Sequence, residues 1–168
     1  MNNLLSIHTV RFVVLILLQV LLFSKINFLG YINPYIYILF IVLYPVKNNR
    51  ILFLFISFLM GLIIDIFMDS GGVNATAALV VAFIRPAILK FSFGAVYEHQ
   101  ALKFNNIDFG QRLTYITILT FIHHFTYFLF EIFNISKIIL VLQHTLFSSI
   151  FTITLCILIT SIFSTKSK

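Results

Sequence analysis

Charged side chains are scarce in this chain: Asp, Glu, Lys and Arg together make up 10% of its 168 residues. A soluble domain carries about 25% charged residues, so this chain has too few of them to cover its apolar surface in water. Apolar residues make up 61% of the positions, and the mean hydropathy is +1.08. The composition therefore excludes a soluble globular domain and predicts an all-α integral membrane protein.

Cysteine and catalytic motifs are scarce as well. The only cysteine is Cys156, which excludes an internal disulfide and a cysteine metal cluster. Its place in the last apolar run favours a packing role. The sequence contains no HExxH pair, no Walker loop and no Ser-His-Asp arrangement. We therefore expect no enzymatic activity, no metal and no cofactor.

The few charges that are present have an excess of positive sign, +6 at pH 7. The basic residues lie at the ends of apolar runs, where they are typical of membrane topology rather than of nucleic-acid binding. The first apolar run lacks the basic start and the small-residue cleavage site of a signal peptide, so we expect it to be a retained span.

The apolar runs predict a single-domain bundle of about six transmembrane helices, because each crossing needs about 20 residues. In chain order, the expected spans cover residues 8–24, 28–46, 51–68, 72–89, 113–133 and 137–163. The second is the least regular because Asn33 and Pro34 interrupt it, and an interfacial segment followed by a short helix from Pro34 is the alternative. We expect the connection from Phe91 to Arg112 to lie along the membrane surface with short helical pieces.

The basic residues are unequally divided between the two sides of these spans. Nine lie on one side: Arg11, Lys47, Arg50, Arg85, Lys90, Lys103, Arg112, Lys166 and Lys168. The other side has Lys25 and Lys137. Because Lys and Arg accumulate on the cytoplasmic side of a membrane, both termini are expected in the cytoplasm.

The stretch GLIIDIFMDSGGVNATAALVVAFIRP, Gly61 to Pro86, predicts a helical hairpin. Asp65 lies within its first apolar run, and an ionisable residue inside a span is costly and usually faces the bundle interior. Gly71 and Gly72 indicate a tight turn, and the second helix is expected to run to about Leu89 and to close with Arg85, Pro86 and Lys90.

Small residues recur along the second helix of this hairpin. They are spaced four, three and four apart, at Gly71, Ala75, Ala78 and Ala82. This spacing places them on one helix face, where small side chains let another helix approach closely, while Leu79 and Val81 are expected to point elsewhere. The face either packs against another helix of the same chain or receives the single span of a partner.

Further polar residues lie in the outer halves of the expected spans. His123 and His124 fall near the middle of the fifth span and Glu131 near its outer end, and the sixth carries Gln143 and His144. Such groups serve as interhelical hydrogen bonds, as a contact surface for a partner, or as a proton or substrate path. Because His123 and Glu131 are eight residues apart on one helix, they cannot share one metal ion.

These motifs carry a family resemblance. The stretch GLIIDIFMDSGGVNATAALVVAFIRP resembles the central segment of the MreD family of bacterial rod-shape-determining membrane proteins. That segment has a GLxxD pattern, followed by a glycine-containing turn and a helix with small residues. Residues 121–133, FIHHFTYFLFEIF, are similar to the fifth span of MreD proteins from Bacteroidetes-type bacteria. The turn SGGVNA departs from the family pattern, which has a leucine or proline near the second glycine.

The resemblance implies a non-enzymatic scaffold in the bacterial inner membrane. With the single-span protein MreC, MreD links cytoplasmic MreB filaments to the peptidoglycan synthases of the elongation complex. The alternative is the substrate-binding subunit of an energy-coupling-factor transporter, which also has about six spans. Those subunits typically present alanines four apart on their first span, whereas the first span here reads RFVVLILLQVLLFS.

Overall fold

The computed structural model describes residues 2–28, 30, 32–46, 49–94 and 107–162. Within these ranges the chain is a helical bundle without strands, apart from an isolated bridge between Phe28 and Ile32. Its helices are α1 (Asn2–Leu21), α2 (Ile38–Leu43), α3 (Arg50–Met68), α4 (Val73–Phe93), α6 (Phe109–Ile132) and α7 (Ile138–Ile162), with short 3₁₀ helices at Phe23–Lys25 and Ile135–Lys137.

Five segments in the described part of the chain are long and apolar enough to cross a membrane. They are His8–Lys25, Arg50–Met68, Val73–Phe93, Phe109–Ile132 and Ile135–Ile162. They confirm the expected all-α architecture of a multi-pass membrane protein. Each corresponds to an expected span, and only the second expected span has no helix of this length.

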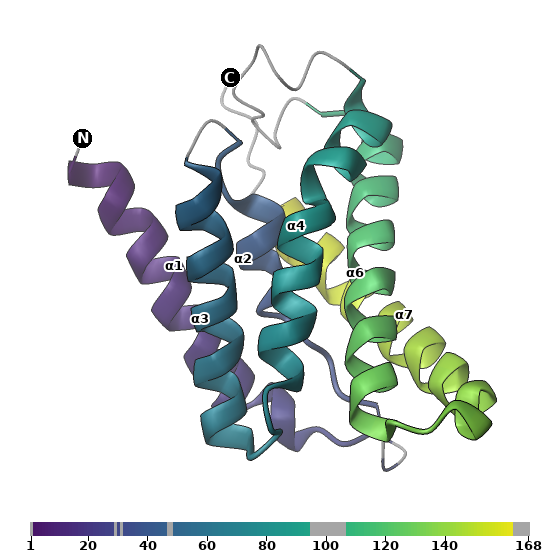
Figure 1. Cartoon of the computed structure of the whole chain (residues 1–168). Helices are drawn as coiled ribbons and strands as arrows, with labels where there is room; N and C mark the ends of the chain where they lie inside the picture. The colour runs from purple at the N-terminus through teal and green to yellow at the C-terminus, as the bar shows by residue number, and fades with distance from the viewer. Residues whose placement is uncertain (1, 29, 31, 47–48, 95–106, 163–168) are drawn as a thin grey trace.

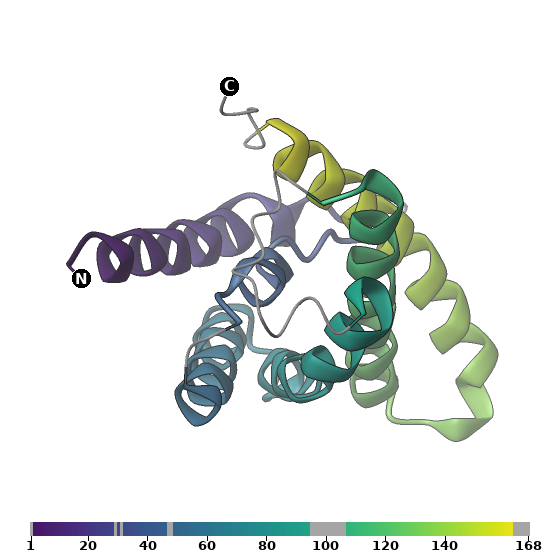
Figure 2. The ribbon, with the colours of Figure 1, turned by 90° about the horizontal axis from the view of Figure 1, so that it is seen from above.

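Residues 28–46 do not form the continuous helix expected for that second span. Pro34 has no N–H to donate and disfavours helical geometry in the residue before it, so regular helix begins only at Ile38. The short helix α2 that follows is buried: each residue from Tyr35 to Val42 is at most 2% exposed. Viewed from above, α2 lies near the centre of an arc formed by the longer helices (Figure 2).

The segment from Pro34 to Tyr44 runs antiparallel to α1. Gln19 bonds to the backbone at its beginning, whereas Arg11 bonds to the Leu43 carbonyl and His8 packs on the Tyr44 ring near its end. From Gln19 to His8 the contacts extend over about 16 Å of α1, at 1.5 Å per residue. The chain thereby returns through the interior of the bundle before α3 begins (Figure 1).

The two ends of the bundle carry different parts of the chain (Figure 1). One end, here called the turn end, holds residues 22–28 and 32–33 and the α3–α4 and α6–α7 turns. The opposite, N-terminal end holds the start of α1 and the α2–α3 junction, and α4 ends and α6 begins there. Five of the seven described basic residues lie toward the N-terminal end: Arg11, Arg50, Arg85, Lys90 and Arg112. Lys25 and Lys137 lie at the turn end.

Helix α4 extends beyond Leu89, the expected end of its span. Arg85 and Pro86 lie inside it, and it ends at Phe93, where Gly94 follows with a positive φ of 66°. Proline is tolerated within helices of membrane bundles because neighbouring groups satisfy the freed carbonyl. Most of the connection expected on the membrane surface, residues 95–106, lies outside the described residues.

Candidate functional site

The carboxylate of Asp65, near the end of α3, points at the N-terminus of α4. Its Oδ1 accepts hydrogen bonds from the Asn74 N–H (2.9 Å), from Asn74 Nδ2 (3.0 Å) and from Ser70 Oγ (2.5 Å). Its Oδ2 accepts one from the Ala75 N–H (2.8 Å). The first N–H groups of a helix lack partners within the helix, and Gly72 has no side chain to cap them. Asp65 therefore caps α4 from the neighbouring helix, at the end where a carboxylate is favoured.

Gly61 makes this cap geometrically possible. A Cβ atom added at Gly61 would lie 2.5 Å from the Asn74 carbonyl oxygen and 2.5 Å from the Ala75 Cα, both of which belong to the backbone. No side chain can therefore replace the glycine without moving α4 away from α3. The GLxxD pattern thus describes one device, in which Gly61 lets the helices approach and Asp65 caps the approaching one.

The small-residue face of α4 is buried within the chain itself. Ala75, Ala78 and Ala82 are at most 2% exposed. Helix α4 packs most extensively against α3 and α6. Of the two expected occupants of the groove, a helix of the same chain is the one present, and no room is left for a partner's span.

The structure corrects the expectations for Gly71 and Val81 and confirms those for the tight turn and for Leu79. Gly71 is not part of the face, because α4 begins only at Val73. Gly71 and Gly72 instead form the expected tight turn, with positive φ angles of 64° and 92°. Val81 is 0% exposed and so does not point away from the core as expected, whereas Leu79 is 37% exposed.

The network around Asp65 extends to the predicted His123. The Asn74 amide, which donates to Asp65, lies with its Oδ1 3.2 Å from the Tyr37 hydroxyl. That hydroxyl is 2.6 Å from His123 Nε2. The other ring nitrogen, His123 Nδ1, is buried without a partner among the described residues. The structure therefore joins Asp65 and His123, as their similar depth in the sequence suggested, through two residues that the sequence did not single out.

His124 is held in a separate chain of hydrogen bonds. Its Nδ1 lies 2.8 Å from the Thr120 carbonyl and its Nε2 3.1 Å from Thr152 Oγ1. The same Thr152 oxygen accepts a bond from the Tyr35 N–H at 3.1 Å. The network assigns the proton of His124 to Nδ1, because the Thr120 carbonyl can only accept a hydrogen bond, and Nε2 then accepts from the Thr152 hydroxyl. Both nitrogens of His124 are thereby satisfied, and the bonds link α6 to α7 and to the irregular segment before α2.

Arg85 lies toward the other end of the bundle and does not join this network. It is 4% exposed, and its Nε donates to the Tyr115 hydroxyl at 2.8 Å. Its Nη2 donates to the carbonyls of Val42 and Tyr44, which end α2. The last carbonyls of a helix lack intrahelical partners, so Arg85 caps the C-terminus of α2.

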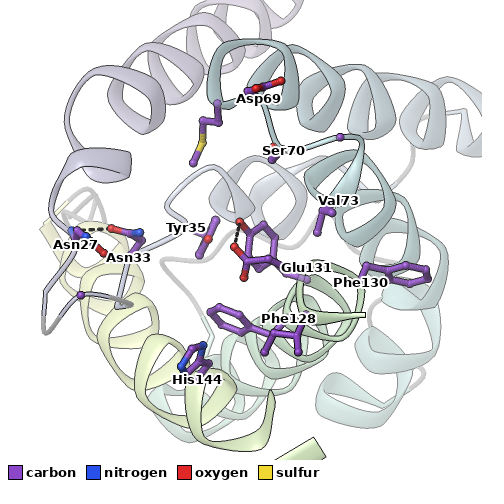
Figure 3. A pocket seen from close by; sticks show the side chains of 15 residues that line it. Asn27, Asn33, Tyr35, Asp69, Ser70, Val73, Phe128, Phe130, Glu131 and His144 are labelled. Carbon is purple, nitrogen blue, oxygen red and sulfur yellow. Dashed lines mark hydrogen bonds between the residues drawn. The ribbon is translucent and has the colours of Figure 1, made fainter. Parts of the chain in front are cut away.

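Glu131 occupies a different environment from the buried histidines. It lies at the end of α6, exposed at the turn end, and its Oε1 accepts a bond from the Tyr127 hydroxyl at 3.2 Å. Both residues line a cavity of about 760 Å³, together with Tyr35 and His144. Figure 3 shows the Glu131 carboxylate near the middle of this cavity, while Asp69 lies at its edge.

Several residues that organise the site escaped the sequence-based prediction. Asn74, Tyr35, Tyr37 and Thr152 were not singled out. A usable signal existed for the first three: an asparagine two residues after a double-glycine turn, and two tyrosines that follow a proline. In the described part of the chain, no three His, Cys, Asp or Glu side chains are grouped as a metal ion requires.

Among the described residues the arrangement consists of internal helix caps and an open cavity. Comparison of the chain with protein-family models, with curated proteins and with solved structures finds no match in any of the three.

Proposed function

We propose that this chain is a non-enzymatic membrane scaffold of the elongation complex, similar to MreD, in the bacterial inner membrane. The observation that carries the proposal is what its buried polar side chains do. Asp65, Arg85 and Gln19 each bond to backbone groups that a helix end or a proline leaves without partners. In a membrane such groups are costly to leave unpaired, so these side chains serve the shape of the bundle.

The resemblance to MreD adds weight to this proposal because it falls on the same residues. Gly61 and Asp65, which form the GLxxD pattern, hold the closest backbone approach between α3 and α4. A scaffold needs a fixed shape rather than a reactive group. The proposed partners are MreC and, through the complex, MreB and the peptidoglycan synthases.

The proposed orientation places the N-terminal end of the bundle in the cytoplasm. Five of the seven described basic residues lie toward that end, and Lys and Arg accumulate on the cytoplasmic side of membranes. The turn end, with the cavity beside Glu131, would then face the outside.

The test of the scaffold role is complementation together with co-purification. We expect the chain to restore rod shape to a rod-shaped bacterium that lacks its own MreD when it is expressed with the MreC of its own genome. We also expect MreC to co-purify with it from detergent. Round cells at normal expression, together with an absence of MreC, would overturn the proposal.

One observation favours a second candidate function. A cavity of about 760 Å³ is large enough for a small molecule, as a substrate-binding transport subunit requires. For such a subunit, co-purification should yield a membrane-bound energising subunit with its ATPases instead of MreC.

A further inference from the structure

The cavity at the turn end has no part in the scaffold role and needs its own explanation. It lies between the loop that contains Asn27 and Asn33, the α3–α4 turn and the end of α6. Its volume of about 760 Å³ is within the range of about 300–1,000 Å³ that is typical of small-molecule sites. Segments far apart in the sequence thus surround one space of ligand size.

The charge around this cavity is opposite to that of the whole chain. Two of the four described carboxylates, Asp69 and Glu131, line it, whereas none of the seven described Lys and Arg residues does. The other polar lining includes the side chains of Asn27, Asn33 and Ser70, which are neutral. In a chain with a net charge of +6, this acidic space favours a cation as its occupant.

Part of the wall of the cavity is aromatic. The rings of Tyr35 and Tyr127 lie 4.6 Å apart, and the Phe128 ring lies edge-on to Tyr127 at 5.1 Å. All three side chains are at most 3% exposed, so neighbouring groups hold them in place. Aromatic faces attract organic cations, and most strongly where water is excluded.

Glu131 supplies an anionic acceptor next to this wall. Its Oε1 accepts the Tyr127 hydroxyl, while its Oε2 accepts no hydrogen bond from the described residues. A free carboxylate oxygen beside aromatic rings matches an ammonium group, which needs a charged acceptor and apolar contact together. A metal ion would need at least three grouped ligands, and the described residues contain no such group of His, Cys, Asp or Glu side chains.

We propose that the cavity at the turn end binds an organic ammonium group, with Glu131 as its charged partner and Tyr35 and Tyr127 as its aromatic wall. The cavity lies where the helices end, and the ends of helices that cross a membrane lie near the lipid headgroups. The ammonium group therefore has two sources with the same chemistry: the headgroup of phosphatidylethanolamine, or a free alkylamine.

The test uses the full chain in detergent and two lipids with identical acyl chains, phosphatidylethanolamine and phosphatidylglycerol. Native mass spectrometry measures how much of each remains bound. We expect phosphatidylethanolamine to be preferred by about tenfold, the size of effect that one charge-assisted hydrogen bond produces. Glu131→Gln should abolish the preference, because glutamine keeps an acceptor for Tyr127 but carries no charge.

Asp108→Asn is the matched control. It also neutralises an acid, but at the N-terminal end, where Asp108 caps α6 and asparagine can cap the helix equally well. It should leave the preference unchanged. Tyr127→Phe keeps the ring and removes the bond to Glu131, so it should preserve most of the binding. Gel filtration of each variant checks that the fold is intact.

A second arm identifies the source of the amine. Butylammonium chloride should raise the unfolding temperature of the wild-type chain but not that of Glu131→Gln, with sodium chloride at equal ionic strength as reference. If butylammonium stabilises the chain but neither lipid is preferred, the site is supported and its ligand is a free amine. Neither effect, or equal effects in Glu131→Gln, would overturn the proposal.

Discussion

At the scale of single residues, three of the buried polar side chains pair with backbone groups that have lost their partners. Asp65 satisfies N–H groups at the start of α4, and Arg85 satisfies carbonyls at the end of α2. Gln19 bonds to the Pro34 carbonyl and the Ile36 N–H, where proline interrupts the helix. Each of these three residues therefore accompanies a helix end or a proline inside the bundle, where water cannot replace the missing partner.

The donors around Asp65 predict a graded response to substitution. Asp65→Asn can keep the three bonds at Oδ1, but it places an amide NH₂ against the Ala75 N–H. Asp65→Leu loses all four bonds. We expect the asparagine variant to lose about 1–3 kcal/mol of stability and the leucine variant more, measured as unfolding temperature in detergent and as abundance in the membrane.

Asp69→Asn serves as control for this series. Asp69 is exposed, and its positive φ of 52° suits asparagine, so stability should be unchanged. If Asp65 instead took part in a proton path, the two Asp65 variants would lose function equally while remaining as stable as the wild type. That pattern would contradict the capping role.

At the scale of elements, the sequence predicted the positions of the long helices better than the structure of the segment between α1 and α3. Long apolar runs locate α3, α4, α6 and α7 within a few residues, because a membrane demands length and apolarity that are visible in composition. The segment after Pro34 was wrongly predicted to belong to a continuous membrane-spanning helix for the same reason. It is apolar because it is buried at the centre of the bundle, and composition does not distinguish burial among helices from burial in lipid.

The sequence predicted several residues of the candidate site but not the hydrogen bonds that connect them. Asp65, His123 and Glu131 stand out because ionisable groups are rare in spans. The link through Tyr37 depends on how the segment before α2 enters the bundle, which the residue pattern does not encode. Tyr127, by contrast, is four residues from Glu131 on the same helix. The cavity beside Glu131 escaped prediction because segments far apart in the sequence surround it.

The buried face of α4 leads to a prediction about packing. Ala78→Leu adds three carbons at a position that is 0% exposed, facing helices that already fill the space. Overpacking of this kind costs about 1–3 kcal/mol. We expect lower abundance and a lower unfolding temperature before any loss of partner binding.

Ala87→Leu makes the same change at an exposed position of the same helix and should be neutral. Normal stability of Ala78→Leu combined with a loss of MreC would contradict the internal packing. It would indicate that the face opens to receive a partner's span.

At the scale of the whole molecule, the two ends of the bundle differ in charge and in shape. The N-terminal end has most of the described basic residues, and the turn end has the acidic cavity. Helix α1 begins and α7 ends toward the same side of the bundle (Figure 1). This arrangement requires the irregular segment before α3 to cross the bundle as a full helix would.

The last prediction tests this crossing by the accessibility of single cysteines. In a Cys156→Ala background, Ile26→Cys and Ile135→Cys at the turn end should react with a membrane-impermeant maleimide in intact cells. Gln111→Cys and Ile51→Cys at the N-terminal end should react only after the membrane is opened. All four positions are exposed, and none of these substitutions changes the charge that sets the topology. Ile26 and Ile51 flank the irregular segment, so labelling of both from the outside would show that this segment does not cross the membrane.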